Sequence, residues 1–484
     1  MGLSTLDYIV FLIFIIGTII FGCSFFSNKR NSKEYTSAGG KLSAWVVGMS
    51  IFATYVSSIS FLALPGNAYM GNWNPFVFSL SIPLASWVAA RYFVPFYRKN
   101  DCISAYGFLE ERFGYWARVY ASCCYLLTQI ARIGSVLYLM ALPLHVMLGW
   151  SVPSIIILTG LCVIIYSVLG GISAVIWTDA IQGIILITGA LACALILLFS
   201  IPGGPSQLFS IAIKYHKFSL GSFGTELNDT TFWVTLLYGI FINLQNYGID
   251  QNYVQRYKTA KDDRSARSAA LFGGLLYVPV SMFFFFIGTA LFVYYKVYPD
   301  LLPAGTPNDG VFPYFIVNGL PTGITGLLIA AICAAGMSTV STSINSSATI
   351  ILTDFFQHKK LLSEKKKMKI LYASSFILGF LGVGLGVALM SVQSALEAWW
   401  SLAAIFSGGM LGLFLLGYLT KRVKSIHASI GVTCGVILIA WMSSNENIYF
   451  HKYLTIVFGT IAIFLIGFLS AIILRRHSEK ARTQ

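Results

Sequence analysis

Long apolar runs constrain this chain more than any other feature of its sequence. Five of them cover residues 8–21, 151–169, 180–201, 371–390 and 454–474. A helix needs roughly 20 apolar residues to cross about 30 Å of hydrocarbon, and each run is close to that length. Because the runs are continuous rather than alternating, they favour a helical bundle over a β-barrel. Only 10% of the residues are charged, against about a quarter in soluble domains. The chain is therefore predicted to be an all-α membrane protein.

Hydrophobic periodicity along the chain predicts about thirteen transmembrane helices in a single domain, 1–484. The predicted segments are 5–27, 44–68, 74–97, 118–148, 152–171, 176–201, 231–256, 267–297, 313–356, 368–392, 395–420, 425–444 and 450–475. The longest connections, about 202–230 and 298–312, contain proline and glycine residues that favour short capping turns.

Basic residues are unevenly distributed between the connections. The formal net charge of +14 comes from clusters at every second connection, namely 29–41, 91–118, 256–267, 359–369, 421–424 and the tail from 475. This pattern follows the positive-inside rule, so we expect these loops to be cytoplasmic, with the N-terminus outside and the C-terminus inside. A nucleic-acid-binding patch, the other interpretation of a basic chain, would not alternate in this way. We therefore expect the lipid bilayer as a partner, and no nucleic acid.

The sequence contains no arrangement typical of an enzyme. The six histidines are scattered, and the chain lacks the HExxH, GxSxG and GxxxxGK[ST] motifs. We therefore expect no catalysis, and in particular no ATP hydrolysis, so that transport would be driven by an ion gradient or by the gradient of the solute itself.

The second predicted segment carries a cluster of hydroxyl groups. Thr54, Ser57, Ser58 and Ser60 do not all fit on one helical face. The cluster suits a local break in the helix, where free backbone carbonyls and hydroxyls bind ions or solute near the centre of the membrane. The alternative is that the hydroxyls donate to carbonyls of their own helix.

The ninth predicted segment carries a second cluster. Ser338, Ser341, Thr342 and Asn345 recur at intervals of three and four residues, so they share one face of a helix. Hydroxyl and carbonyl oxygens suit a hard cation such as sodium, whereas transition metals prefer histidine or cysteine. Small residues of this kind also allow close helix packing, and the pattern by itself leaves that alternative open.

Two isolated charges lie within apolar segments. Arg132 is inside the fourth segment, where it needs either an anionic ligand or a pairing partner from the protein. Asp179 stands at the start of the sixth segment. The seventh segment ends in a polar stretch, 243–256, which predicts a gate, a water-lined inner path or a helix that emerges into the cytoplasm.

Three longer motifs carry a family resemblance. They lie at 104–113 (SAYGFLEERF), at 170–183 (GGISAVIWTDAIQG) and at 319–345. In these stretches, and along nearly all of its length, the chain resembles the sodium solute symporter family. The resemblance implies a leucine-transporter-like core of two inverted five-helix repeats, 44–201 and 231–420, joined by 202–230. One extra helix, 5–27, would precede the core and two, within 425–475, would follow it. The first helix of each repeat, in the second and seventh segments, would be broken.

The resemblance also implies one or two sodium sites, with two favoured. The first would use carbonyls of Ala53, Val56 and Ala335 and the hydroxyls of Ser338 and Thr339. The second would use Asp179, Ser338, Ser341 and Thr342.

Within the family, the chain is most similar to the bacterial sialic acid carriers. That similarity implies an anionic sugar substrate bound by Ser57, Ser58, Ser60 and Arg132. The third segment departs from the pattern, because Pro75 and Ser79 stand where an aromatic residue and a glutamine are expected. Thr54, Asn74, Ser79 and Asn243 complete the predicted substrate site. A monocarboxylate, an amino acid such as proline and another sugar remain alternative substrates. The resemblance further implies a bacterial cytoplasmic membrane and a functional monomer.

Overall fold

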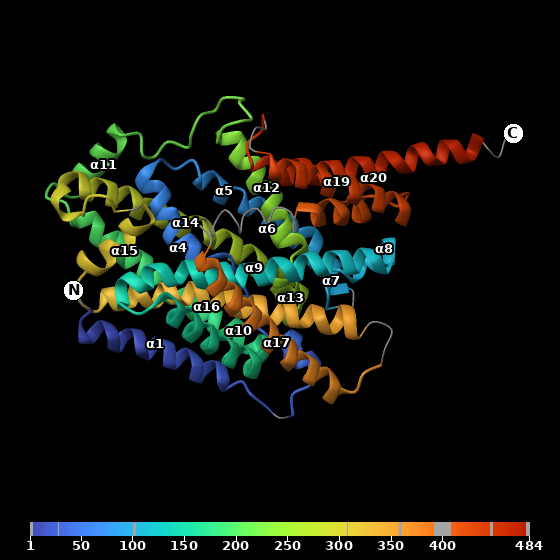
Figure 1. The fold of residues 1–484 in the computed structure, drawn as a ribbon, viewed down its shortest axis with the longest axis horizontal. Coiled ribbons are helices and arrows are strands. Elements are labelled where there is room, and N and C mark those ends of the chain that lie inside the picture. Colours follow the sequence, from blue (N-terminus) through green and yellow to red (C-terminus); the bar gives the residue numbers. More distant parts are fainter. Residues whose placement is uncertain are drawn as a thin grey trace.

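The computed structural model describes residues 3–27, 29–99, 103–306, 308–357, 361–391, 408–445 and 449–480. Within these residues the chain forms a bundle of helices that lie side by side (Figure 1), with no β-strand beyond one bridge between Leu42 and Ala260. Nine of the described helices are long and apolar enough to cross a membrane, and a bent pair makes a tenth. The prediction of an all-α membrane protein is confirmed.

The first group of helices lies before residue 230 in the sequence. They are α1 (Thr5–Cys23), α2 (Ser32–Ser37), η1 (Ala38–Gly40), α3 (Ala44–Tyr55), α4 (Ser58–Met70), α5 (Phe76–Leu80), α6 (Ile82–Val88), η2 (Ala89–Phe93), α7 (Val94–Lys99), α8 (Gly107–Phe113), α9 (Tyr115–Leu148), α10 (Val152–Phe199) and α11 (Gly204–Lys214). Elements α5 to α7 form one continuous apolar span over residues 76–99.

The remaining helices follow after residue 230. They are α12 (Phe232–Ile249), α13 (Gln251–Thr259), α14 (Asp263–Val297), η3 (Pro299–Leu301), α15 (Asn308–Asn318), α16 (Ile324–Ile350), η4 (Ile351–Phe356), α17 (Glu364–Ala388), η5 (Leu389–Ser391), α19 (Ser425–Ser444) and α20 (Leu454–Lys480). A shorter helix covers Gly408–Leu419. The first part of the predicted eleventh segment, up to residue 407, lies outside the described residues.

Two helices are broken, in the second and seventh predicted segments, as the family resemblance implied. Between α3 and α4 the backbone is extended at Val56 (ψ 111°) and Ser57 (ψ 168°), and the two halves are bent by 55°. Between α12 and α13 the backbone is extended at Asp250 (φ −74°, ψ 128°). An extended residue inside a span releases carbonyl groups from the helical hydrogen-bond ladder, so they become free to accept from a ligand.

The helix α10 is long enough for two crossings and turns sharply in the middle. Its 48 residues are interrupted at Gly171, whose φ of +59° and ψ of −160° are accessible mainly to glycine. Arg30 stabilises this turn, since its guanidinium donates to the carbonyls of Gly170 (2.7 Å) and Leu169 (3.1 Å). The predicted fifth and sixth segments, 152–171 and 176–201, are therefore the two legs of α10.

The prediction of a single ninth span, 313–356, was wrong at its start. The structure ends α15 at Asn318 and begins α16 at Ile324. The reason is local, because Pro321 cannot donate a backbone hydrogen bond and Gly323 has a φ of +88°, outside the helical region. Starting at Ile324, α16 packs against α1, α3, α9, α10 and α17, and almost all of its residues are buried. Its hydroxyl groups therefore face protein, not lipid.

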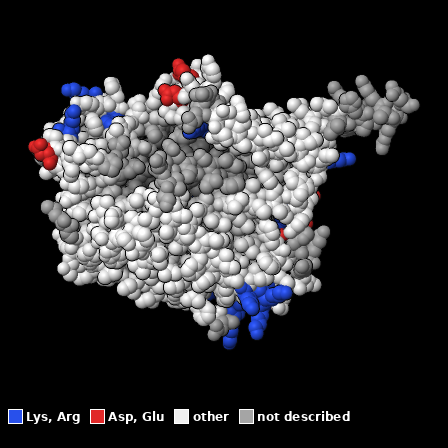
Figure 2. Space-filling view, viewed as in Figure 1, with Lys and Arg blue, Asp and Glu red and all other residues white. Residues whose placement is uncertain are grey.

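Charged side chains avoid the middle of the visible surface. In Figure 2 the charged residues gather toward the edges of the molecule, and basic residues cluster at its lower edge, where the loop after α1 and the start of α17 lie in Figure 1. A hydrogen bond from the Ser32 amide to Glu364 (2.9 Å) joins these two segments. We call the face that carries these loops the basic face.

A buried ion network closes the basic face around α9. The Asp354 carboxylate accepts from Ser104 (2.8 Å), Ser122 (2.6 Å) and Arg118 (2.6 Å), and Arg118 also pairs with Glu110 at 2.9 Å. Residues 104 and 110 belong to the SAYGFLEERF motif. The structure therefore gives this motif a structural role, in which it fixes the end of α16 against α9.

Removing the Asp354 carboxylate should destabilise the protein strongly. We expect Asp354→Ala to cost about 3–5 kcal/mol of unfolding free energy, because Arg118 would be left as an under-compensated buried charge. Thermal unfolding in detergent would measure the loss. The matched control is Lys367→Ala, which breaks a pair with the half-exposed Glu364 and should cost less than about 1 kcal/mol. Equal losses in the two variants would contradict the prediction.

On the face opposite the basic face, Lys217 holds a connection onto the end of α4. Its ammonium donates to the carbonyls of Tyr69 (2.6 Å), Gly71 (3.0 Å) and Ala68 (3.4 Å), and lies 3.8 Å from the centre of the Phe292 ring. Burial lowers the pKa of Lys217 from its ordinary value of 10.5 to about 8.

The lowered pKa of Lys217 predicts a pH dependence of stability. Between pH 8 and 10.5 the unfolded chain holds this proton more tightly than the folded one, so stability should rise with pH in that window. We expect Lys217→Met to remove this part of the rise in melting temperature. Identical pH profiles for the wild type and the variant would show that Lys217 does not titrate as the structure indicates.

Candidate ion and substrate site

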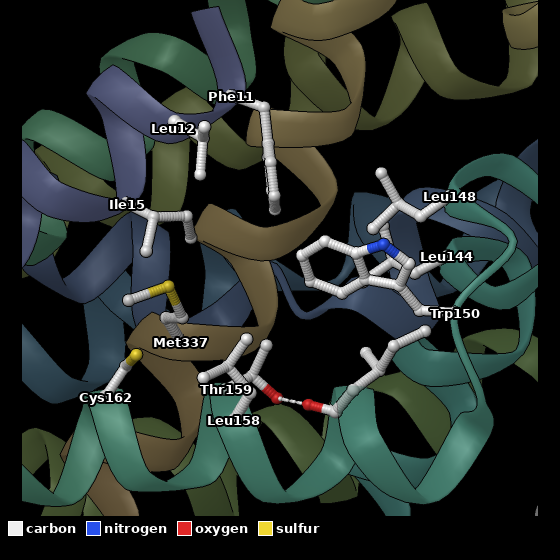
Figure 3. Close-up of a pocket in the computed structure, with 11 residues that line it drawn as sticks. Phe11, Leu12, Ile15, Leu144, Leu148, Trp150, Leu158, Thr159, Cys162 and Met337 are labelled. Atoms are coloured by element: carbon white, nitrogen blue, oxygen red, sulfur yellow. Dashed lines mark hydrogen bonds between the residues drawn. The ribbon is translucent and has the colours of Figure 1, made fainter. Parts of the chain in front are cut away.

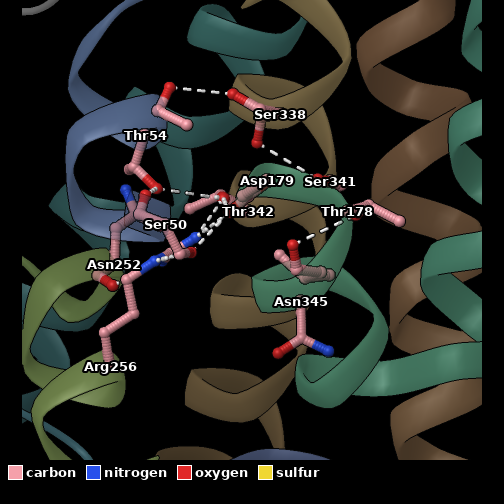
Figure 4. Close-up of polar contacts among 12 residues, drawn as sticks. Ser50, Thr54, Thr178, Asp179, Asn252, Arg256, Ser338, Ser341, Thr342 and Asn345 are labelled. Atoms are coloured by element: carbon pink, nitrogen blue, oxygen red, sulfur yellow. Dashed lines mark hydrogen bonds and ion pairs between the residues drawn. The ribbon is translucent and has the colours of Figure 1, made fainter. Parts of the chain in front are cut away.

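The last turn of α3 meets the hydroxyl stripe of α16 beside the first helix break. Ser338 donates to the carbonyl of Ala53 at 2.8 Å, and the hydroxyls of Thr54 and Thr342 lie 3.5 Å apart (Figure 4). Thr54 also donates back to Ser50 of its own helix (2.7 Å). Both clusters of hydroxyls found in the sequence therefore lie at one place in the fold.

This contact joins two members of the ligand set predicted for the first sodium site, one from each helix. The structure brings the Ala53 carbonyl to Ser338, and the Ala335 carbonyl accepts from Thr339 at 3.1 Å within α16. Val56 stands at the extended break. The set offers hydroxyl and carbonyl oxygens, which are the ligand types that suit sodium.

The second predicted sodium site is centred on the buried Asp179 of α10. Its Oδ2 accepts from Ser50 (2.7 Å) and lies 3.5 Å from the Thr342 hydroxyl, while Ser341 donates to the Ser338 carbonyl (3.1 Å). The other oxygen, Oδ1, is buried and has no hydrogen-bond partner. An unsatisfied buried carboxylate oxygen is costly, so it is suited to accept a cation.

Arg256 was not predicted as part of any site, yet the structure places it against Asp179. Its Nη2 lies 2.7 Å from Asp179 Oδ2 and 2.5 Å from the Thr342 hydroxyl, and its Nε donates to Ser50 at 2.8 Å. Both members of the ion pair are buried. Two features of the sequence could have indicated this pair. Asp179 lies within an apolar segment and so needs a cation, and Arg256, at the end of the polar stretch of the seventh segment, is a candidate for that cation.

That polar stretch is not a helix emerging into water, because α13 is almost wholly buried. The Asn252 side chain accepts from Tyr125 (2.9 Å) and from Ser346, and Gln255 donates to Asn345 (3.0 Å) and Thr349 (3.1 Å). Backbone hydrogen bonds from Leu42 to Thr259 and from Lys261 to Leu42, both 3.0 Å, tie α13 to the start of α3. This geometry favours a gate as the role of the polar stretch. In this structure the half-helices α3 and α13 are packed together at the basic face.

Arg132 reaches the first helix break from α9. Its Nη2 donates to the Thr54 carbonyl at 3.2 Å, and its side chain is partly exposed. The charges of Arg132 and of Asp250, at the second break, also interact. Arg132 therefore has hydrogen-bonding and charged partners within the protein, which was one of the two alternatives for an arginine inside an apolar segment. A guanidinium has five N–H donors, so a ligand carboxylate can still bind it.

The serines after the break surround the start of α4. Ser57 caps α4, accepting from the Ser60 amide at 3.4 Å, and the buried Ser58 hydroxyl has no hydrogen-bond partner. These hydroxyl groups lie next to the helix break between α3 and α4, where they could form hydrogen bonds with a hydroxylated ligand.

The three remaining predicted substrate residues make contacts within the protein. Asn74 bonds to the Leu220 carbonyl and to Thr235, both at 3.0 Å, and Ser79 to Ser281 at 2.8 Å. Asn243 donates to Ser81 (2.8 Å) and accepts from Tyr55. Among the described hydrogen bonds of these three side chains, only that of Asn243 to Tyr55 reaches the first broken helix, at the end of α3. No hydrogen bond between described residues joins Asn74 or Ser79 to the serines of α4.

A separate pocket lies between α1, α9, α10 and α16 (Figure 3). Its lining is apolar apart from the hydroxyl of Thr159, which is bonded to the Ile155 carbonyl (2.6 Å), and it includes Phe11, Trp150 and Met337. Since no charged side chain lines it, this pocket is unsuited to an anionic solute, and the polar site at the helix breaks is the better candidate.

Comparison with known proteins places this architecture among transporters. Residues 35–435 match the sodium:solute symporter family. The chain is 33% identical to the sodium/sialic acid symporter NanT of Aliivibrio fischeri, over 97% of this chain and 93% of that protein. It is also 33% identical to the sodium/sialic acid symporter SiaT of Proteus mirabilis, over 96% and 95% of the two chains.

Solved structures agree with these relatives. A substrate-bound, outward-open Na⁺-coupled sialic acid symporter superposes with a TM-score of 0.92 at 30% identity, covering 97% of this chain and 98% of that one. A closed form of Mhp1, a nucleobase-cation-symport-1 family transporter, has a TM-score of 0.55 at 14% identity over 93% and 96% of the two chains, a likeness of fold alone.

Proposed function

Because this chain belongs to the sodium:solute symporter family, we propose that it imports sialic acid (N-acetylneuraminic acid) with sodium by alternating access. The observation that carries the proposal is the position of Arg132, which donates to the Thr54 carbonyl at the break between α3 and α4. A guanidinium at this point can bind the carboxylate of an anionic sugar in a two-pronged hydrogen bond. The oxygen-rich cluster for sodium begins at the neighbouring residue, Ala53.

Hydroxyl groups would supply the rest of the substrate contacts. Ser57, Ser58 and Ser60 lie at the start of α4, and the unpartnered Ser58 hydroxyl is available to a ligand. Asn243 would also contact the substrate beside the helix break, since Tyr55 links it to the end of α3. Each of these groups can exchange a hydrogen bond with water for one with a sugar hydroxyl.

A small monocarboxylate is the second candidate substrate. The polar groups of the third segment, Asn74 and Ser79, are bonded to protein partners, which leaves Arg132 and the serines of α4 as the substrate contacts. A human relative at 27% identity is named sodium-coupled monocarboxylate transporter 1. A smaller anion would need only the guanidinium contact.

We propose two coupling sodium ions. The first would bind the Ala53, Val56 and Ala335 carbonyls with Ser338 and Thr339, and the second Asp179 with Ser338, Ser341 and Thr342. Two sodium ions with one sialate carry one net positive charge inward, which gains about 2.3 kcal/mol per 100 mV of membrane potential. A single sodium would make transport electroneutral.

The charge distribution supports an orientation in a bacterial cytoplasmic membrane. With the basic face in the cytoplasm, the N-terminus lies outside and the C-terminus inside, in agreement with the positive-inside rule. We propose that the single chain is the functional unit.

The test is uptake of labelled N-acetylneuraminic acid into proteoliposomes, with an inward sodium gradient and then with potassium in its place. Saturable uptake that requires sodium would support both parts of the proposal. Sodium-dependent uptake of lactate or pyruvate, without uptake of sialic acid, would favour the second candidate. Uptake that is equal in potassium would reject sodium coupling.

A further inference from the structure

The two oxygens of the Asp179 carboxylate have unlike surroundings. Oδ2 accepts from Ser50 and Arg256, both at 2.7 Å, whereas Oδ1 is buried without a hydrogen-bond partner. Gln182, one turn further along α10, is also buried, and neither polar atom of its side chain has a partner. One oxygen of the carboxylate is thus bound by protein donors, while the other oxygen and the Gln182 amide have no hydrogen-bond partner among the described residues.

The committed oxygen joins three elements. Ser50 lies on α3 and Arg256 on α13, the two half-helices that close the basic face, and both donate to an acceptor on α10 (Figure 4). Arg256 is held in turn by its own helix, since its Nη1 donates to the Asn252 carbonyl at 2.7 Å. Any change in the charge available on Asp179 therefore acts directly on one of the contacts that hold α13 in place.

The Asp179 carboxylate carries one negative charge. Two cations, the Arg256 guanidinium and the second sodium ion, would both bind to it. A sodium ion bound at Oδ1 would lie within a few ångströms of the Arg256 guanidinium, in a buried region where like charges repel strongly. Each cation therefore lowers the affinity of Asp179 for the other, and because binding linkage is reciprocal, sodium binding must weaken the attachment of α13.

We propose that Arg256 is a tethered cation that competes with the second coupling sodium for Asp179, and thereby sets the affinity of that sodium site and links its occupancy to the closure of α13. This inference rests on the proposed sodium coupling. It adds a positioning residue that the predicted ligand set does not contain.

The experiment measures sodium binding to the purified protein in nanodiscs, from the rise in melting temperature with sodium concentration at constant ionic strength. We expect Arg256→Gln to lower the half-saturating sodium concentration of the second site by at least about fivefold, because a positive charge is removed from its surroundings. Arg256→Lys keeps the charge and should stay within about twofold of the wild type. The matched control is Arg112→Gln, another arginine of the basic face, which bonds only to the carbonyls of Gly417 and Thr420 among its described partners.

Two results would overturn the inference. Unchanged sodium affinity in folded Arg256→Gln would show that the guanidinium does not compete. Loss of the second sodium in Arg256→Gln, as expected for Asp179→Asn, would show that Arg256 merely orients the carboxylate.

Hydrogen–deuterium exchange on the wild type provides a test that does not depend on a variant folding. Amides of residues 251–259 should exchange faster in sodium than in potassium, and slower or equal exchange would overturn the inference. If the wild type showed no sodium effect of any kind, sodium coupling itself would be rejected, and this inference with it. Sodium-dependent uptake combined with an unchanged Arg256→Gln would reject the inference alone.

Discussion

Arg132→Ala should nearly abolish sialic acid transport while leaving sodium binding in place. Removing one partner of a buried, hydrogen-bonded charge pair typically costs about 2–5 kcal/mol, which corresponds to a loss in affinity of roughly 30-fold to several thousand-fold. The loss should appear in the dissociation constant measured by calorimetry at saturating sodium. Lysine at this position keeps the charge but not the planar pair of donors, so Arg132→Lys should fall between the wild type and Arg132→Ala.

Folding is the main alternative explanation for such a loss, since Arg132 also donates to the Thr54 carbonyl and interacts with the charge of Asp250. Retained stabilisation by sodium in Arg132→Ala would show that the bundle and its ion sites are intact. An unchanged dissociation constant for sialic acid would place the carboxylate elsewhere. It would also remove the observation on which the proposed substrate rests.

Asp179→Asn should convert transport from electrogenic to electroneutral. We expect the Hill coefficient for sodium to fall from about two to about one, because the amide carries no charge to hold the second cation. The lost contribution of one charge is about 2.3 kcal/mol per 100 mV, or about 50-fold in the accumulation that the membrane potential can support. Uptake into proteoliposomes with an imposed potassium diffusion potential measures this dependence directly.

The asparagine variant is more informative than Asp179→Ala, which should also weaken transport. Alanine leaves the buried Arg256 without its ion-pair partner, which is expected to destabilise the protein by about 3–5 kcal/mol, whereas asparagine keeps an acceptor for Ser50 and Arg256. Ser341→Ala, which removes a neutral ligand of the same site, should raise the half-saturating sodium concentration while preserving the voltage dependence. Unchanged sodium cooperativity in Asp179→Asn would reject the second sodium site.

The apolar segments, the broken second helix and the stripe on α16 could all be predicted from the sequence because each depends on residues close together in the chain. Hydrophobicity is summed over some twenty neighbouring residues, and the hydroxyls of Ser338, Ser341 and Thr342 share a face through helical periodicity alone. The start of α16 was missed although its signal was also local, since Pro321 and Gly323 lie inside a run that is apolar on both sides.

Contacts between distant residues were decided only by the tertiary structure. Asp179 and Arg256 are 77 positions apart, and Ser104 and Asp354 are 250 apart. The sequence shows that a buried carboxylate needs a partner, but many cations could meet that need, and only the packing of α3, α10, α13 and α16 selects one. The same packing turns Asn74 and Ser79 toward protein partners and brings Ser338 to the Ala53 carbonyl. Sequence alone therefore determined that this chain is a helical membrane transporter, and it predicted oxygen ligands for a hard cation. The fold decided which charges share the site, because electrostatic pairing acts over ångströms in space and is independent of separation along the chain.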